Sequence, residues 1–478
     1  MKNSYKWLLL GMLSCAFFFH QADRALFGLL TERIQGELHL NDFDMGVIQW
    51  SLFFTLAIMN PIAGFLGDRF SRKWIITLSL IFWSLMTALT GSPLVMGMCG
   101  LVFFRSIATA GGESFYAPSA YALLATHHTK TRSIAMAVHQ AALYVGLIFS
   151  GKIVKWVIDA LDQIPAVVDF FTAAGTWRLV FIIFGGLGLL LGLFFIFGLR
   201  DRPAGESAPE PAKPQTAPEP REKGAFVEGL KAYFCNPSAL LASTGFIAVV
   251  FANNAYMSWA PKFVARKYAV KDVVAGDDTM FWHYVFAFGA IMLGGFLTDF
   301  FVKRSPRFRI GLQAAGLLIG APMLMYFSCA PTYVLMITAI AGYGIFRGLF
   351  EVNTHASLFD VVKPRYRSTA VGLMTMLAFF IGSLAPLLIG WMSKSASEVA
   401  LAAKGLDASQ IELLLKNPMT EAAAPILAQI QMTAQQVLSL GVPGFERGFW
   451  WMGVTYIVGG LAMVASFLFT FRRDRVAE

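Results

Sequence analysis

The sequence predicts an all-α integral membrane protein with twelve transmembrane helices in two pseudo-symmetric six-helix bundles. Three observations predict this fold: an apolar composition, twelve apolar runs of membrane-spanning length, and a short motif that occurs once in each half. Of the 478 residues, 56% are hydrophobic and only 14% are charged, which excludes a water-soluble surface. The same composition excludes a disordered chain, a disulfide-rich secreted scaffold and a nucleic-acid-binding domain.

Apolar runs long enough to cross about 30 Å of hydrocarbon occur six times on each side of a polar segment. We expect the first six spans at Trp7–Leu30, Met45–Leu66, Trp74–Thr90, Leu94–Leu124, Ser133–Ile158 and Leu179–Leu199. The second six are expected at Leu240–Phe263, Phe281–Val302, Ile310–Cys329, Tyr333–Phe359, Thr369–Met392 and Phe449–Phe471. The first run has no small-residue cleavage site, so we predict a retained span and not a secretion signal.

The polar segment between the two sets of spans is rich in Pro, Ala and Glu and has little to bury. We therefore predict an amino-terminal bundle at residues 1–200, a cytoplasmic linker at 201–235, and a carboxy-terminal bundle at 236–478. The second bundle contains an insertion at 393–448, where Asp407 to Gln410 is typical of a helix start. Short helices on the periplasmic or extracellular face are expected there.

The distribution of Lys and Arg predicts that both termini are cytoplasmic. Outside the spans, 23 of these residues lie on the side of the termini; the opposite side carries 12 when Lys152, Lys155 and Lys262, at the ends of spans, are counted there. Positive residues accumulate on the cytoplasmic side of membrane proteins. The net charge of +9 is therefore explained by membrane orientation.

The cysteines give no sign of a disulfide or a metal site. Cys15, Cys99, Cys235 and Cys329 are far apart in the sequence and form no CxxC pair. We expect no metal and no cofactor.

A motif of glycine, aspartate and basic residues occurs at the same place in both halves. It consists of Gly64, Asp68, Arg69 and Arg72 after span two, and of Gly295 and Asp299 after span eight, 231 residues later. Glycine lets two helices approach closely, aspartate pairs with a cation or caps a helix, and the basic residues hold the turn in the cytoplasm. A merely solvated loop would explain only the basic residues, so we predict a conformational gate motif.

At these residues the chain resembles the major facilitator superfamily, whose signature is this loop between spans two and three with a weaker copy between spans eight and nine. The resemblance covers nearly the whole chain. It implies two six-helix bundles around a central cavity, alternating access by rocking of the halves, and a monomer surrounded by membrane lipid.

Few ionisable groups lie at membrane depth, and each is a candidate site residue because a charge in hydrocarbon is costly. In span one, His20, Asp23 and Arg24 are spaced i, i+3, i+4 and so share one helix face. The planar Arg24 guanidinium suits a carboxylate or phosphate, and Asp23 or Glu113 of span four can take up a proton. A structural ion pair that only joins helices is the alternative.

The second half offers a corresponding set. Arg347 and Glu351 lie one turn apart in span ten, with Asn353 nearby, and we predict substrate contact for Arg347 and Asn353 and proton coupling for Glu351. An isolated salt bridge would explain Arg347 and Glu351 equally well. Further predicted substrate ligands, chosen because uncharged donors and aromatic rings suit sugar hydroxyls, are Gln140 and Tyr144 in span five and Asn253, Asn254 and Tyr256 in span seven.

Several short sequences resemble the anion:cation symporter family: Asp23-Arg24, Arg105 with Glu113, Trp177-Arg178, and Trp259-x-Pro261. That resemblance implies proton symport of a sugar acid such as a hexuronate or an aldonate across a bacterial inner (plasma) membrane. Arg24 would bind the substrate carboxylate, and Asp23 and Glu113 would handle the proton. The family usually places the acid seven residues after the arginine. Here the spacing is eight, about 80° round an ideal helix, and a bulge at Gly111-Gly112 could restore the register.

Other readings stay open. The Asp-Arg and Gly-Glu-Ser-x-Tyr sequences also resemble the Spinster lysolipid transporters, for which the cargo would be an amphiphile. A nutrient sensor of the same architecture would bind without net flux. An enzyme is not expected, because neither clustered metal ligands nor a nucleophile with its base can be found.

The main prediction is a secondary active transporter that imports an organic anion with a proton and binds no nucleic acid. Three acids (Asp23, Glu113 and Glu351) balance three arginines (Arg24, Arg105 and Arg347), so a bound anion leaves one negative charge in excess. A proton on Asp23 or Glu113 restores the balance. The proton also cancels about 2.3 kcal/mol, the cost of moving a monoanion against 100 mV.

Overall fold

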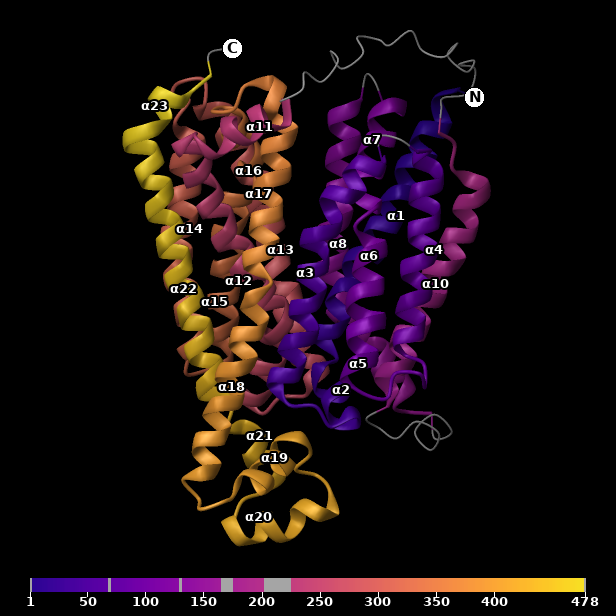
Figure 1. The fold of residues 1–478 in the computed structure, drawn as a ribbon, viewed down its shortest axis with the longest axis vertical. Helices are drawn as coiled ribbons and strands as arrows, with labels where there is room; N and C mark the ends of the chain where they lie inside the picture. Colours follow the sequence, from indigo (N-terminus) through magenta and orange to yellow (C-terminus); the bar gives the residue numbers. More distant parts are fainter. Residues whose placement is uncertain (1, 68–69, 129–130, 165–174, 202–224, 477–478) are drawn as a thin grey trace.

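The computed structural model describes residues 2–67, 70–128, 131–164, 175–201 and 225–476. All regular elements in these ranges are helical, and they form two bundles side by side, one from each half of the chain (Figure 1). α1 begins and α23 ends at one end of the molecule, which we call the termini end. The insertion, with α19 to α21, lies at the opposite end, which we call the insertion end. The predicted all-α fold of two helical bundles is confirmed.

The bounds of the helices follow the predicted spans. The first half contains α1 (Lys2–Leu29), α2 (Thr31–Leu38), α3 (Asp42–Gly67), α4 (Arg72–Thr90), α5 (Met98–Leu101), a π-helix (Val102–Ala108), α6 (Thr109–Glu113), α7 (Tyr116–His127), α8 (Arg132–Leu161) and α10 (Thr176–Gly198). The second half contains α11 (Ala225–Phe234), α12 (Pro237–Tyr268), α13 (Asp272–Phe301), α14 (Phe308–Cys329), α15 (Tyr333–Glu351), α16 (Thr354–Phe359), α17 (Arg367–Gly382), α18 (Leu384–Ala402), α19 (Ala408–Lys416), α20 (Ala424–Ile430), α21 (Ala434–Ser439), α22 (Val442–Ala465), a π-helix (Ser466–Thr470) and α23 (Phe471–Asp474).

Ten helical segments among the described residues are long and apolar enough to cross a membrane. The other two of the twelve predicted spans correspond to α1 and to the segmented run from α5 to α7. Some helices extend beyond the predicted runs: α13 begins at Asp272 instead of Phe281, and α18 continues to Ala402 instead of ending at Met392. The added turns carry charges that hydropathy alone excludes from a span. Asp272, for example, pairs with Arg33 of the other half.

The contacts between the halves follow a two-fold pattern. Span five (α8) packs along span eight (α13), and span two (α3) packs along span eleven (α17 and α18). These two contacts are equivalent under exchange of the halves, because spans two and five of the first half correspond to spans eight and eleven of the second. Spans one and seven (α1 and α12) also meet. This arrangement is the pseudo-symmetry that the repeated motif predicts.

α1 and α12 approach each other closely at Gly28. Pro261 lies inside α12 and lacks the N–H that would bond to the carbonyl oxygen of Met257, four residues earlier. A Cβ atom built at residue 28 would come within 2.0 Å of that oxygen. Any larger residue at position 28 would therefore push the halves apart.

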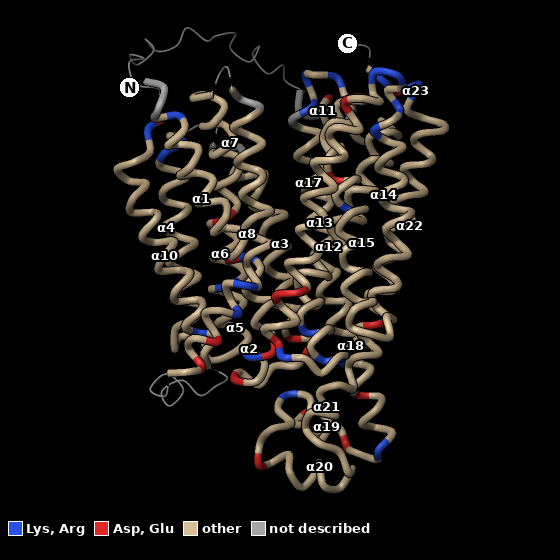
Figure 2. Tube along the Cα trace, turned by 180° about the vertical axis from the view of Figure 1, so that it is seen from behind, with Lys and Arg blue, Asp and Glu red and all other residues tan. Residues whose placement is uncertain are grey.

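Ion pairs join the halves at the insertion end. Arg33 Nε lies 2.9 Å from Asp272 Oδ2, and Arg266 Nε lies 2.5 Å from Glu32 Oε1. Figure 2 shows acidic and basic segments gathered at this end, near α2 and α18. The two bundles diverge from there toward the termini end (Figure 1).

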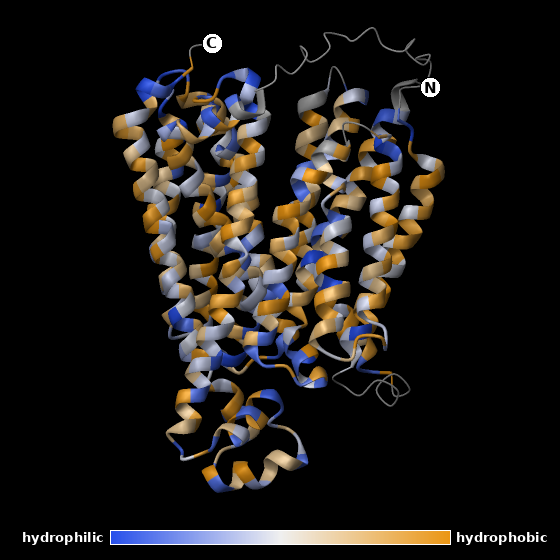
Figure 3. Ribbon diagram, viewed as in Figure 1, coloured by the Kyte–Doolittle hydropathy of each residue, from blue (hydrophilic) through white to orange (hydrophobic). Residues whose placement is uncertain are grey.

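The outer faces of the bundles are apolar. On α10, for example, the side chains of Leu190, Phe194 and Phe197 are exposed, whereas Gly185 and Gly188 face α4. Figure 3 shows hydrophobic segments along both bundles, with hydrophilic segments more frequent at the two ends. The protein is therefore a multi-pass membrane protein whose apolar faces lie against lipid.

The insertion forms a small core of its own. Its buried residues are Leu401, Leu406, Leu414, Ala423, Ile430 and Val437. A capping box of Asp407 and Gln410 starts α19, as predicted, and a second box of Thr433 and Gln436 starts α21. The insertion is thus a folded unit and not an extended loop.

Candidate functional site

Arg24 of α1 is paired with Glu113 of α6. The Arg24 Nη2 and Nε atoms donate to Glu113 Oε2 at 3.1 and 3.3 Å, and His20 Nε2 lies 3.7 Å from the same oxygen. The Glu113 side chain is fully buried, and that of Arg24 is 16% exposed. The helix face that His20 and Arg24 share thus packs against span four. The Arg24 guanidinium is already paired with a carboxylate of the protein itself.

Asp23 has a different cation. Arg105 Nη2 donates to the carbonyl oxygens of Asp23 and Arg24 at 3.1 and 3.2 Å, and Arg105 Nη1 lies 3.7 Å from Asp23 Oδ2. Thr87 of α4 donates to the same Asp23 oxygen at 2.9 Å. Thr87 could not be predicted, because one threonine in an apolar span is usually satisfied by its own backbone.

The π-helix explains how Arg105 and Glu113 both reach α1. A π-turn takes up one extra residue, so eight steps turn the chain about as far as seven α-helical steps, which leaves roughly 20° between the two side chains. The sequence predicted that a bulge could restore this register, but placed it at Gly111-Gly112. The π-turn lies one turn earlier, at Val102–Ala108, where it includes Arg105 itself. Gly112 instead packs against Trp83 of α4.

These four charges form what we call the first-half cluster: Asp23, Arg24, Arg105 and Glu113. Two cations balance two acids, as a buried site requires. Glu113 Oε1 and Asp23 Oδ1 are buried without a hydrogen-bond partner. Each acid therefore has one oxygen that could carry a proton, and protonation of Glu113 would weaken its hold on Arg24.

The second-half cluster consists of Arg347, Glu351 and His283. Arg347 Nη2 lies 3.1 Å from Glu351 Oε2, and Arg347 Nη1 lies 3.1 Å from His283 Nε2. An arginine only donates, so His283 Nε2 is the acceptor and is unprotonated. The Glu351 side chain is 29% exposed and interacts electrostatically with Tyr144 of the first half.

Sequence reasoning missed His283. The predicted span began only two residues before it, and a single histidine in an apolar run gives no periodic signal. The ring stacks on Tyr343 with centroids 4.6 Å apart, and its imidazole is fully buried. Its position against Arg347 depends on α13 packing along α15, which no local pattern reveals.

The three side chains of span seven that were predicted to bind sugar hydroxyls form hydrogen bonds within the second half instead. Tyr256 donates to the carbonyl oxygen of Thr279 at 2.7 Å, and Asn253 Oδ1 accepts from Tyr284 at 3.2 Å. Asn254 Nδ2 donates to the carbonyl oxygen of Gly382 at 3.2 Å. Pro386 has no N–H for that oxygen, so Asn254 satisfies a carbonyl at the break between α17 and α18.

The other predicted ligands are separated. Gln140 accepts a hydrogen bond from Tyr121, and Tyr144 packs against Phe288 of the second half with ring centroids 5.8 Å apart. Asn353 is buried and donates to Thr298 at 2.9 Å, between α15 and α16, where it joins two spans. The structure thus brings together the charged candidates of each half, while the uncharged candidates mostly bind protein partners.

The predicted gate motif is described only in part. Asp68 and Arg69 lie outside the described residues, and Gly64 belongs to the last turns of α3. Arg72 donates to Thr126 of α7 at 2.9 Å, and Asp299 is exposed near the end of α13, four residues after Gly295. The gate role of these residues stays a prediction.

Neither a metal site nor a disulfide is found among the residues that the structure describes. No group of three or more His, Cys, Asp or Glu side chains is placed to hold a metal ion there. The four cysteines are free and exposed on the protein surface.

A family model described as Major Facilitator Superfamily matches residues 12–386. Protein spinster homolog 1 of Xenopus tropicalis is 26% identical over 385 residues, which is 77% of this chain and 68% of that protein. The human protein spinster homolog 1 is 25% identical over 409 residues, 81% of this chain and 72% of that protein.

Solved structures are also similar. A bacterial homologue of the human lysosomal transporter Spinster, in an inward-facing and unoccupied conformation, superposes with a TM-score of 0.81 at 23% identity and covers 99% of both chains. The inward-facing and occupied conformation gives a TM-score of 0.77 at 24% identity, again over 99% of each chain. At these identities the likeness shows the fold alone.

Proposed function

Because the chain belongs to the Major Facilitator Superfamily of membrane transporters, we propose that it carries an amphiphile with a charged head and a long tail, such as a lysolipid, by proton-coupled alternating access. The observation that carries this choice of cargo is the state of the predicted sugar-acid site. Arg24 is held by Glu113, and Asn254 and Tyr256 are bonded within their own half. A small sugar acid would thus meet few free hydroxyl partners.

The apolar part of the interface between the halves favours a cargo with a long apolar tail. The halves also meet through Phe54 and Phe380, with ring centroids 5.6 Å apart, and through Phe288 and Tyr144, which interacts with Glu351. Phe54 and Phe288 are half-buried, and Phe380 is exposed. Apolar rings beside a polar cluster suit a molecule with both characters. The relatives named spinster support the same cargo class.

The proton is assigned to the first-half cluster. In the paired state, Arg24 has no free charge to offer a phosphate or carboxylate head. A proton on Glu113 removes that competition, and the guanidinium can then take the head group, so binding and protonation favour each other. Sugar-acid symport would use the same exchange, which is why cargo and coupling need separate tests.

We also propose that the termini end faces the cytoplasm. The excess of Lys and Arg on that side supports this orientation. The ion pairs at the insertion end then close the outer side, and the conformation described here is inward-facing.

The cargo is tested by thermal stabilisation of the purified protein in detergent. Lysophosphatidylethanolamine is expected to raise the melting temperature, whereas glucuronate and gluconate leave it unchanged. Arg24→Ala should abolish the shift, and Lys152→Ala, which removes a cation of the insertion end, should keep it. Stabilisation by the sugar acids with uptake into proteoliposomes would instead support sugar-acid symport, and binding without flux would indicate a sensor.

A further inference from the structure

The insertion at residues 393–448 is attached only to the second half but also contacts the first half. It begins within α18 and leads into α22, and α18 continues into it without a break as far as Ala402. Its own buried core makes it a folded unit. A rigid-body movement of the second half would therefore carry the insertion with it.

The short helices of the insertion contact the first half at the end of α2, and Ser393, where the insertion begins in α18, donates a hydrogen bond to Asp42 of α3. Asn417 Nδ2 of the insertion is 2.6 Å from His39 Nδ1. His39 ends α2 in the left-handed conformation, with φ of 55°, and its side chain is exposed. Lys416 interacts electrostatically with Asp44 of the first half.

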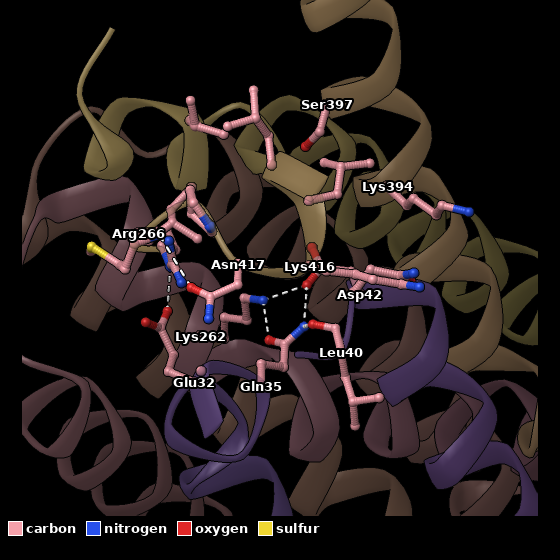
Figure 4. A pocket seen from close by; sticks show the side chains of 18 residues that line it. Glu32, Gln35, Leu40, Asp42, Lys262, Arg266, Lys394, Ser397, Lys416 and Asn417 are labelled. Carbon is pink, nitrogen blue, oxygen red and sulfur yellow. Dashed lines mark hydrogen bonds and ion pairs between the residues drawn. The ribbon is translucent and has the colours of Figure 1, made fainter. Parts of the chain in front are cut away.

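A pocket of about 230 Å³ lies beneath this contact. Leu414, Met419 and Val437 of the insertion line one side of it, and Gln35 and Leu40 of the first half line another. Figure 4 shows Lys262 of the second half directed at Gln35 and Asp42, and Arg266 directed at Glu32. The insertion thus covers the ion pairs that join the halves.

The contact at His39 and the ion pairs beneath it differ in strength. A single hydrogen bond at an exposed histidine contributes little, since water competes for both partners. The ion pairs below are half-buried or buried and are stronger candidates for holding the halves together. A weak outer contact can break and re-form in each cycle.

We propose that the insertion is a lid: it closes the insertion end by binding His39 through Asn417, and it detaches whenever that end opens. The proposal rests on the alternating access of the proposed function, but on no property of the cargo. Opening moves the second half, and the lid with it, away from α2.

The lid is tested with Asn417→His, which places a second imidazole beside His39 so that Zn²⁺ can bridge the two. The reporter is Gln49→Cys, in a background where the four native cysteines are changed to alanine. Gln49 is 4% exposed and donates to Ser258 of the other half at 3.2 Å, so a cysteine there becomes reactive only when the halves separate. A membrane-impermeant maleimide is applied from the insertion side.

Zn²⁺ is expected to slow labelling at least about tenfold, and a chelator should restore the rate. His39→Ala combined with Asn417→His is the matched control, in which Zn²⁺ should have no effect. His39→Ala alone should speed labelling by about two- to tenfold, the effect of losing one hydrogen bond.

Equal labelling rates with Zn²⁺ and with chelator would overturn the proposal. Slowing of the same size in the control would also overturn it, because the metal would then act elsewhere. If Zn²⁺ slows labelling while lysophosphatidylethanolamine fails to bind, the lid stands and the proposed cargo falls.

Discussion

The two halves hold their membrane-depth charges in different ways. In the first half, each arginine pairs with an acid on another span, so the cluster ties α1 to span four. In the second half, Arg347 and Glu351 belong to one helix, and only His283 comes from a neighbour. A proton added to Glu113 therefore changes the contact between two helices, whereas one added to Glu351 acts mainly within α15. Protonation in the first half would thus loosen a contact between helices, as the proposed proton coupling requires.

The first-half cluster is also more deeply buried than the second-half cluster. Glu113 and Arg105 are fully buried, while almost a third of the Glu351 side chain is exposed. Removing one charge and leaving its partner unpaired should therefore destabilise the protein more in the first-half cluster than in the second-half cluster.

Arg105→Met should have the largest effect on stability. It leaves the Asp23 carboxylate buried without its cation and removes the donor to two α1 carbonyl groups. We expect a loss of about 3–5 kcal/mol in the free energy of unfolding, measured by denaturant titration in mixed micelles. Arg105→Lys keeps the charge and should lose less. If the Met variant were as stable as the wild type, the joining role of this cluster would be wrong.

Glu113→Gln should have the second-largest effect on stability and the largest effect on transport. The amide still accepts from Arg24, so the cost in stability should be about 1–3 kcal/mol. Uptake should no longer respond to an imposed pH gradient, because the exchangeable proton is gone. Glu351→Gln is the matched control and should keep the response. Full pH-driven uptake by Glu113→Gln would move proton coupling to Asp23, for which Asp23→Asn is the test.

His283→Phe probes the second half. The ring can still stack on Tyr343, but Arg347 loses one of its two acceptors. A destabilisation of about 1–2 kcal/mol is expected in the same titration. His283→Gln, which restores an acceptor, should recover part of the loss. A Phe variant of unchanged stability would show that Glu351 alone satisfies Arg347.

Glu351→Gln should have the smallest effect on stability. Its pair with Arg347 lies within one helix and is partly exposed, so we expect a change of less than about 1 kcal/mol in unfolding free energy. A cost as large as that of Arg105→Met would remove the contrast between the halves.

Much of this arrangement could be predicted from local patterns. The helical period places His20, Asp23 and Arg24 on one face, and the two copies of the glycine–aspartate motif reveal the repeated unit. The pairing itself could not be predicted, because it depends on how span four is rotated against span one. That rotation is set by a π-turn at Val102–Ala108, for which the sequence carries no fixed signature. The roles of Asn254 and His283 likewise depend on neighbouring spans far away in the chain.

The π-turn has a consequence for comparing this chain with its relatives. It behaves as a one-residue insertion: it keeps Glu113 in phase with Arg105, but it offsets the residue numbers on its two sides by one, or about 100° of helix, relative to a protein without it. A position-by-position alignment with a protein that has the seven-residue spacing needs a one-residue gap inside 102–108. Without that gap, one of the two stretches of span four would be matched to residues on the wrong side of the helix.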